Sequence, residues 1–363
     1  MFTRQRLTIV TALAFALIMT GAPAFSATIA GTKCSKAGAS KTLNNLKFTC
    51  IKSGKKLIWN KGVAVKSPTN SGITTSPAVQ AQLGARMATI TSIQLLADRL
   101  WKNSQGMNVE DPIMYTEKNH PANALNLVGA KTARQMIMSF SPMFPNFPIY
   151  MFDSQSWINN QIKDSCPILV NNLTGGGAQV GCGKLIINSL NSYGNDPARL
   201  KNNPAYAYLE SAHETFHLAQ AFFESSAGGG AWEKIPAWYR EGSAMVFGNM
   251  VASVILKKNP DYATIALTNG NSWKKEFCAT RFETWRINNA AEPFNPNNSC
   301  EYSLGQIMIE YLVNKVDAID KVLLVYQMVA IGNTFDEAIK YAFGIEKSAL
   351  FTELDAYLTS LNW

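Results

Sequence analysis

The 363-residue sequence contains few charged residues and very little histidine. Asp, Glu, Lys and Arg make up 16% of it, where about 25% is usual for a soluble protein, and only three residues are histidine. Hydrophobic residues make up 47%, which excludes an intrinsically disordered chain. The sequence also lacks an apolar run of the about 20 residues that cross a bilayer, since its charge-free run at residues 7–19 has 13. We therefore expect a folded protein without a transmembrane segment.

The N-terminus has the three-part layout of a secretory signal peptide. Arg4 and Arg6 precede the apolar residues 7–19, and small residues follow at Ala24 and Ser26. This layout predicts a signal peptide over residues 1–26, with cleavage after Ser26. A buried N-terminal helix is the alternative interpretation of the same run. The protein is therefore predicted to be secreted, either extracellular or associated with the cell envelope.

Acidic residues are absent before Asp98, so the formal net charge of +8 is unevenly distributed. Nine lysines lie between residues 27 and 66. Without them and the two arginines of the signal peptide, 22 basic residues face 25 acidic ones, a net charge of −3. Two strand-like runs around the turn residues Ser53-Gly54 predict a small basic β-hairpin module over residues 27–63. Residues 64–81 are rich in Ser, Thr, Pro and Gly and are predicted to be a linker.

The lysines of residues 27–66 allow two interpretations. They could form a basic patch for an anionic polymer of the cell envelope, with each lysine acting as a point charge. They could instead be a solvated face or part of a pro-segment. Nucleic-acid binding is not expected, because the rest of the chain is slightly acidic and the basic segment has few aromatic residues. We predict a monomer.

The six cysteines show no CxxC spacing, which argues against a cysteine-based zinc site. An even number of cysteines in an exported protein supports disulfide bonds. Six cysteines allow 15 pairings. The simplest one joins sequence neighbours, Cys34 with Cys50, Cys166 with Cys182 and Cys278 with Cys300.

Two of the three histidines lie four residues apart in a segment that predicts a long helix. Residues 205–223 contain neither Pro nor Gly and include His213-Glu214-x-x-His217, the HExxH pattern. The spacing places both imidazoles on one helix face, where they can share one zinc ion. Glu214 is predicted to act as general base and acid on a zinc-activated water. Two ordinary surface or core histidines are the alternative. His120 lies in a polar loop and is left out of the site.

A catalytic zinc site needs a third protein ligand and an open position. Gln220 and Phe223 stand where the metzincin pattern requires glycine and histidine, which excludes that class. Three carboxylates remain within reach downstream. Glu224 is close in sequence to His217, Glu233 adjoins a glycine run, and Glu241 begins a second helical segment.

The segment Trp238-x-x-Glu241-Gly242-x-Ala244, following an HExxH helix, resembles the gluzincins, metallopeptidases of the MA-like clan whose zinc is held by two His and one Glu. It is most similar to their aminopeptidase branch. By this resemblance Glu241 is the third zinc ligand. Tyr302-x-x-Gly305 matches the motif whose tyrosine stabilises the oxyanion.

The resemblance implies an α+β zincin-type domain over residues 82–363. Residues 82–227 would form its α+β part, with a mixed sheet and the active-site helix, and residues 228–363 a helical bundle. In this family the strand before the HExxH helix is an edge strand that pairs with substrate, and residues 182–188 occupy that place. Two departures are clear. The Gly-x-Met-Glu-Asn segment of the aminopeptidases is absent, and Met245 stands where thermolysin-like relatives have a carboxylate behind a histidine ligand.

These patterns predict a secreted zinc metallopeptidase with one catalytic zinc ion and a peptide or protein substrate. The alternative is a cell-envelope binding protein. In that case the zincin body would be degenerate, and the lysine-rich module would bind anionic wall polymer.

Overall fold

The computed structural model describes two compact units, with the boundary between residues 74 and 75. The predicted signal peptide and most of the predicted linker lie outside the described residues. The described residues are 31–43, 46–61, 63–64, 77–170, 173, 178–189, 198, 200, 205–258, 261–267, 273–288 and 299–363.

The smaller unit is an antiparallel sheet of four strands rather than a hairpin alone. Its strands are β1 (Ser40–Leu43), β2 (Leu46–Ser53), β3 (Lys56–Trp59) and β4 (Val63–Ala64), and β2 pairs with each of the others. The predicted hairpin is β2–β3, but its turn is Gly54-Lys55, where Gly54 has a positive φ of 62°. The predicted disulfide Cys34–Cys50 holds the unit together, and Phe48 and Cys50 are buried among those of its side chains that the structure describes.

The larger unit contains a mixed four-stranded sheet with the order β5-β6-β8-β7. Strands β5 (Ile113–Thr116), β6 (Pro148–Phe152) and β8 (Lys184–Asn188) are parallel, and β7 (Ala178–Gly181) is antiparallel to β8. An α+β fold with a mixed sheet is therefore confirmed.

Side chains alternate between the two faces of this sheet, as the pleat requires. Ile149, Met151, Leu185 and Ile187 enter the main core. Tyr150, Phe152 and Ile186 face the other way and pack against α3 (Gln155–Ile162). The sheet is thus apolar on both faces.

The prediction that residues 182–188 form an edge strand is wrong. The strand β8 lies inside the sheet, and β7 is the edge. Cys182 and Gly183 form a two-residue turn in which both residues have positive φ (47° and 69°), the geometry that folds one strand back on the next. The predicted disulfide Cys166–Cys182 fastens this turn to the segment after α3.

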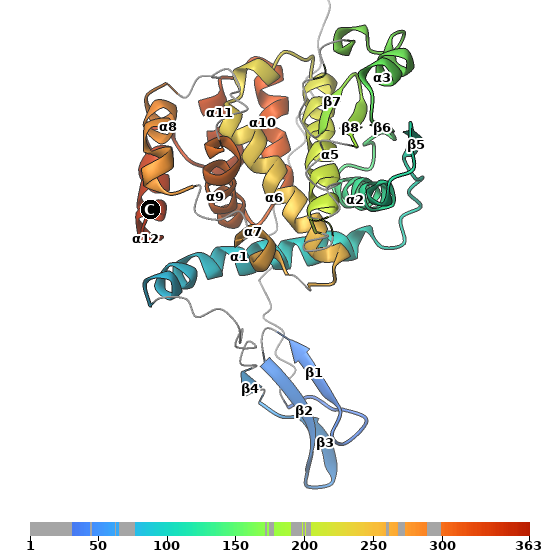
Figure 1. Ribbon diagram of the computed structural model, residues 1–363. Helices are drawn as coiled ribbons and strands as arrows, with labels where there is room; N and C mark the ends of the chain where they lie inside the picture. The colour runs from blue at the N-terminus through green and yellow to red at the C-terminus, as the bar shows by residue number, and fades with distance from the viewer. Residues whose placement is uncertain are drawn as a thin grey trace, which may run out of the picture. The chain divides into compact units, whose positions relative to one another are not determined.

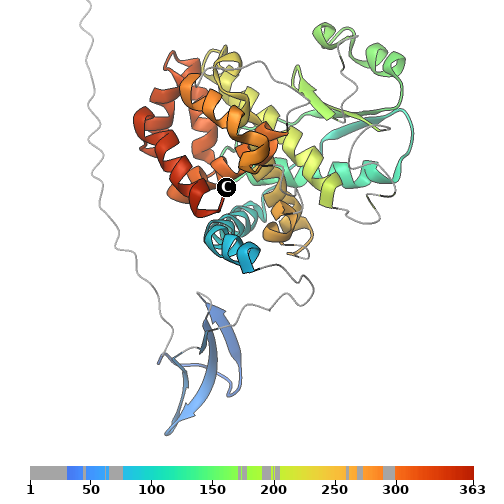
Figure 2. The ribbon, with the colours of Figure 1, turned by 60° about the vertical axis from the view of Figure 1, so that its left-hand side comes forward.

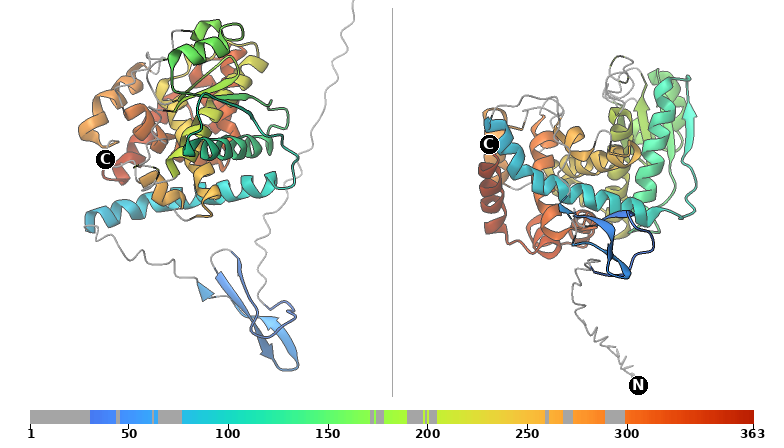
Figure 3. Two further views of the ribbon diagram at one scale, coloured as in Figure 1. Left: turned by 45° about the vertical axis from the view of Figure 1, so that its right-hand side comes forward. Right: turned by 90° about the horizontal axis from the view of Figure 1, so that it is seen from below.

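The remainder of the larger unit is helical, in agreement with the expected helical segment after residue 228. Helices α5 and α6 run through its middle, with the sheet on one side and the C-terminal helices on the other (Figures 1 and 2). Helix α1 runs across one end of this arrangement (Figure 3). The helices are α1 (Pro77–Ser104), α2 (Pro121–Met138), α5 (Ala205–Ser226), α6 (Ala237–Ile255), α7 (Tyr262–Leu267), α8 (Lys275–Asn288), α9 (Cys300–Val316), α10 (Asp320–Ala330), α11 (Phe335–Phe343) and α12 (Lys347–Ser360), with 3-10 turns η1 (Pro167–Leu169) and η3 (Trp232–Lys234).

A buried ion pair joins α1 to α9. The Arg86 guanidinium donates to both carboxylate oxygens of Glu310 at 2.8–3.0 Å, and the two side chains are 5% and 0% exposed. Tyr262 and Gln306 donate to the same carboxylate, at 2.9 and 2.8 Å. The charge of Glu310 is thus balanced by one cation and two neutral donors inside the core.

All three predicted disulfide pairings are present. Within the part of the chain that the structure describes, no helix has the length and apolarity needed to cross a membrane. The three disulfide bonds fit an extracellular protein.

His120 lies away from the other two histidines, at the start of α2. Its Nε2 atom is 2.8 Å from Oδ1 of Asp153, which follows β6. Lys118 pairs with the other oxygen of that carboxylate at 3.0 Å. The third histidine therefore belongs to an ion-pair cluster at the carboxyl ends of β5 and β6.

Candidate metal centre

His213 and His217 occupy successive turns of α5, as the four-residue spacing requires. Both are buried, with exposed fractions of 6% and 5%. Their ring centroids are 4.7 Å apart, and their Nε2 atoms approach to 3.1 Å. Both imidazoles therefore direct the same nitrogen toward one point.

Glu241 on α6 reaches the same point. Its Oε2 atom lies 3.3 Å from His213 Nε2 and 3.2 Å from His217 Nε2. Ligand atoms placed tetrahedrally at about 2.0–2.1 Å from zinc would lie about 3.3–3.4 Å from one another. Two imidazole nitrogens and a carboxylate oxygen are also a donor set that zinc accepts. The three residues therefore fit a zinc ion in both geometry and chemistry.

The other carboxylates considered as third ligands are differently placed. Glu224 accepts hydrogen bonds from the backbone amides of Ala231 and Trp232, at 2.8 and 3.1 Å, and so holds the loop after α5. Glu233 is exposed on η3. Of the three candidates, Glu241 is the one whose carboxylate contacts both imidazoles.

Glu214 adjoins the three ligand-type atoms, with a carboxylate oxygen within 4.8 Å of a ring nitrogen of each histidine. Its Oε1 atom is 4.0 Å from His213 Nε2, farther than Glu241 from either histidine. Burial, together with the neighbouring Glu241 carboxylate, raises the pKa of Glu214 to about 8 against the opposing effect of His217. Glu214 is therefore a carboxyl whose proton affinity suits proton transfer near neutral pH.

The two histidines and Glu241 shift one another's pKa values. Burial lowers the pKa of His213. Burial acts in the same direction on His217, but the Glu241 carboxylate outweighs it and raises the pKa of His217 to about 9. Burial disfavours the ionised form of Glu241, yet the two imidazoles hold its pKa well below the usual range. Glu241 is therefore an anion that attracts a cation to this point.

Tyr302 comes to the centre from the first turn of α9. Its ring lies over that of His213, with centroids 5.9 Å apart and an interplanar angle of 29°. Burial raises the pKa of Tyr302, and the carboxylates of Glu241 and Glu214 raise it further. Its hydroxyl, which hydrogen-bonds to Glu241, therefore stays protonated and can act as a donor.

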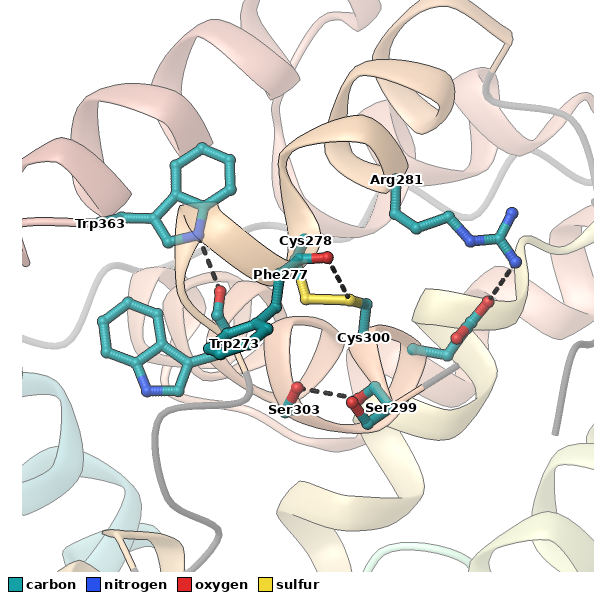
Figure 4. The surroundings of a disulfide bond; sticks show 9 residues. Trp273, Phe277, Cys278, Arg281, Ser299, Cys300, Ser303 and Trp363 are labelled. Atoms are coloured by element: carbon teal, nitrogen blue, oxygen red, sulfur yellow. Dashed lines mark hydrogen bonds and ion pairs between the residues drawn. A yellow bond between two sulfur atoms is a disulfide. The ribbon is translucent and has the colours of Figure 1, made fainter. Parts of the chain in front are cut away.

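The first turn of α9 is fastened on both sides of Tyr302. The predicted Cys278–Cys300 disulfide ties it to α8, and Arg281 of α8 pairs with the buried carboxylate of Glu301 at 3.1 Å (Figure 4). Ser303 donates to the carbonyl of Ser299 at 2.8 Å in the same turn (Figure 4). The disulfide, the ion pair and the hydrogen bond thus fix the helix turn that contains Tyr302.

Two glycines let α6 and α9 approach closely. Gly242 follows Glu241, Gly305 is three residues after Tyr302, and their backbones are in contact. A Cβ on Gly305 would lie 2.5 Å from the Trp238 carbonyl oxygen, closer than such atoms can come. Gly242 and Gly305, one from each sequence motif, therefore allow the close helix contact that places Tyr302 opposite Glu241.

We predict that Gly305→Ala destabilises the protein. The added methyl must push α6 and α9 apart, at a cost of about 1–3 kcal/mol or more, which exceeds the about 1 kcal/mol that alanine gains over glycine in a helix. Urea denaturation would measure the loss in free energy of unfolding. Asn314→Ala is the control on the same helix, because Asn314 is only half-buried and lies outside the contact. A Gly305→Ala variant as stable as wild type would show that the helices can separate without cost.

A run of three glycines connects α5 to the segment that carries Glu241. Gly228, Gly229 and Gly230 have φ of 116°, 79° and 78°, a conformation that favours glycine. The chain then places Trp232 edge-on to His217, with ring centroids 5.6 Å apart. Arg240 lies 5.2 Å from the centroid of Trp232, and its Nη1 donates to the Trp232 carbonyl at 2.7 Å. The glycine run thus lets the chain turn so that the Trp232 ring packs against His217.

Gln220 is a residue that the sequence patterns did not single out as functional. It is fully buried, and its Oε1 atom is 2.7 Å from Nδ1 of His217. The Nδ1 atom of His213, in contrast, has no hydrogen-bond partner among the described residues. The position of Gln220 was informative only for excluding the metzincins, since a local pattern does not show which side chain lies behind an imidazole.

Comparison of the chain with protein-family models, curated proteins and solved structures finds no match.

Proposed function

We propose that this protein is a secreted zinc metallopeptidase of gluzincin type. The observation that carries the proposal is the convergence of His213 Nε2, His217 Nε2 and Glu241 Oε2 at mutual distances of 3.1–3.3 Å. Two imidazole nitrogens and a carboxylate oxygen at these distances are a donor set that zinc accepts. A zinc ion bound there would polarise a substrate carbonyl and lower the pKa of a water molecule.

The chain's own residues supply the proton transfers and charge stabilisation. In this proposal Glu214 accepts a proton from the attacking water at its carboxylate and delivers it to the amine that leaves. The Tyr302 hydroxyl donates a hydrogen bond to the substrate oxygen as that oxygen becomes negative. Both residues lie beside the three ligands without being among them, which suits these roles.

The proposed substrate is an extended peptide that pairs with β7. Among the described residues this strand is the sheet edge next to α5, with no strand paired to its outer side. A peptide added there would be held by main-chain hydrogen bonds. The antiparallel strand β7 thus takes the role that the resemblance assigned to residues 182–188.

Metal analysis and peptide hydrolysis test this proposal together. Purified wild type should carry one zinc ion per chain and cleave members of a broad peptide library in a chelator-sensitive way. His213→Ala should lose both properties. His120→Ala is the matched control, because it removes the histidine outside the centre. Wild type that shows no chelator-sensitive cleavage would rule out the peptidase proposal.

The smaller unit supports a second proposal, binding of an anionic cell-envelope polymer. Every lysine of residues 31–61 whose side chain the structure describes is exposed, and the sequence contains no acidic residue before Asp98 that could neutralise them from within the unit. The unit is therefore an uncompensated positive surface. The lysines are Lys33, Lys36, Lys52, Lys55, Lys56 and Lys61.

Retention on isolated cell walls tests the second proposal. Replacing Lys52, Lys55 and Lys56 by glutamine in the full chain should weaken retention, and added salt should weaken it for wild type, because exposed charges are screened. The matched control replaces three exposed lysines of the larger unit, Lys163, Lys234 and Lys257. Equal losses in both triple variants, or retention insensitive to salt, would exclude a dedicated surface on the smaller unit.

A further inference from the structure

The amide of Gln220 lies between the two helices that supply the proposed zinc ligands. It belongs to α5, three residues after His217, and is 0% exposed. On one side its Oε1 atom meets His217 Nδ1 at 2.7 Å. On the other side its Nε2 atom donates to the carbonyl of Arg240 at 3.1 Å and to the hydroxyl of Ser243 at 2.8 Å. The two hydrogen bonds that Gln220 donates therefore join α5 to the turn of α6 around Glu241, whereas its carbonyl oxygen faces His217 on its own helix.

The orientation of this amide follows from its partners on α6. A backbone carbonyl can only accept, so the atom that faces Arg240 must be the amide nitrogen. The Ser243 hydroxyl donates to the same carbonyl at 3.0 Å, which leaves its oxygen free to accept from Gln220. The carbonyl oxygen of Gln220 must then face His217.

An acceptor behind His217 decides which nitrogen of the imidazole carries hydrogen. Because Oε1 cannot donate, Nδ1 must be the protonated nitrogen. Nε2 is then the nitrogen that faces Glu241 and His213 and that would offer its lone pair to a zinc ion. A histidine ligand is normally oriented by such a bond from its other nitrogen.

We infer that Gln220 is the positioning residue of the proposed metal centre, which orients His217 for coordination through Nε2. The inference rests on the proposed zinc site. It also explains why Arg240 and Ser243, on either side of Glu241, are turned toward α5. The Gln220 side chain thereby fixes the position of His217 on α5 relative to the turn of α6 that carries Glu241.

Three substitutions of Gln220 distinguish the effect of its hydrogen-bond acceptor from the effect of its packing. Gln220→Glu keeps an acceptor behind His217, whereas Gln220→Leu and Gln220→Met remove it at similar volume. Loss of such a bond weakens metal binding by about 10–100-fold. We expect that weakening for the Leu and Met variants in competition between protein and chelator for zinc, and a value within a few-fold of wild type for the Glu variant. Thermal melting would confirm that each variant is folded.

The proton itself gives a readout that needs neither zinc nor catalysis. In the full chain labelled with ¹⁵N-histidine there are three imidazoles, and His120→Gln removes the one outside the centre. Wild type should show an exchange-protected proton on His217 Nδ1, and Gln220→Leu should lose that protection. A His217 without a proton on Nδ1 would overturn the inference. A Glu variant that binds zinc as weakly as the Leu variant would also overturn it. Wild type that binds no zinc but shows the protected proton would instead refute the metal centre.

Discussion

Replacing Glu214 by glutamine is expected to leave zinc bound and to lower peptide hydrolysis by about 10²–10⁴-fold, the contribution of a positioned general base. The amide has nearly the shape of the carboxylate but cannot accept the proton of an attacking water. Glu214 lies outside the set of His213, His217 and Glu241, which would hold the metal. The loss should therefore appear in kcat at unchanged zinc content.

Zinc analysis and steady-state kinetics on one preparation measure both quantities. Glu233→Gln is the matched control, because it makes the same change at an exposed carboxylate of the loop between α5 and α6. Its activity should equal that of wild type. A Glu214→Gln variant with full activity would show that the proton goes to another group, and one without zinc would show that Glu214 helps to hold the metal.

Replacing Arg86 by methionine is expected to lower the free energy of unfolding by about 3–5 kcal/mol, the usual cost of removing one partner from a buried ion pair. Glu310 would remain as an anion at 0% side-chain exposure, with only the neutral donors Tyr262 and Gln306. The penalty comes from the charge that is left, so the double variant Arg86→Met with Glu310→Gln should recover much of the loss.

Urea denaturation of the single and double variants measures this effect. Arg99→Met is the control on the same helix, because Arg99 pairs with Asp317 at the surface, where the side chains are 46% and 61% exposed. Exposed pairs contribute about 0–1 kcal/mol. If Arg86→Met and Arg99→Met cost the same, burial does not set the strength of the pair between α1 and α9.

The features that could be predicted are those encoded by neighbouring residues. The four-residue spacing of His213 and His217 places both on one face of any helix. The disulfide pairing of neighbouring cysteines could be predicted in the same way, because close spacing is a local property of the sequence. The edge strand was assigned wrongly, because β7 follows a glycine-rich segment and its pairing depends on the positive φ of Cys182.

The hydrogen-bond partner of His217 could not be predicted for a different reason. Gln220 is a polar residue at a buried position of α5. In the sequence it only interrupts the apolar pattern of the helix, and nothing there shows which group it bonds. Its role depends on where α6 crosses α5, since the Arg240 carbonyl and the Ser243 hydroxyl orient its amide. The same limit applies to His120, which precedes α2 and whose partner Asp153 follows β6, 33 residues further along the chain.

By itself the sequence determined the residue types of the candidate site, the helix that carries both histidines, the pairing of the cysteines and the concentration of positive charge before residue 67. Tertiary structure alone decided which strand forms the sheet edge and which amide orients His217, and it brings Glu241, which the sequence motif had named, into contact with both histidines. The division has a physical cause. Helical periodicity and charge density are set by adjacent residues, whereas the 3.1–3.3 Å distances of the centre depend on how α5, α6 and α9 pack. That packing depends in turn on the close contact at Gly242 and Gly305.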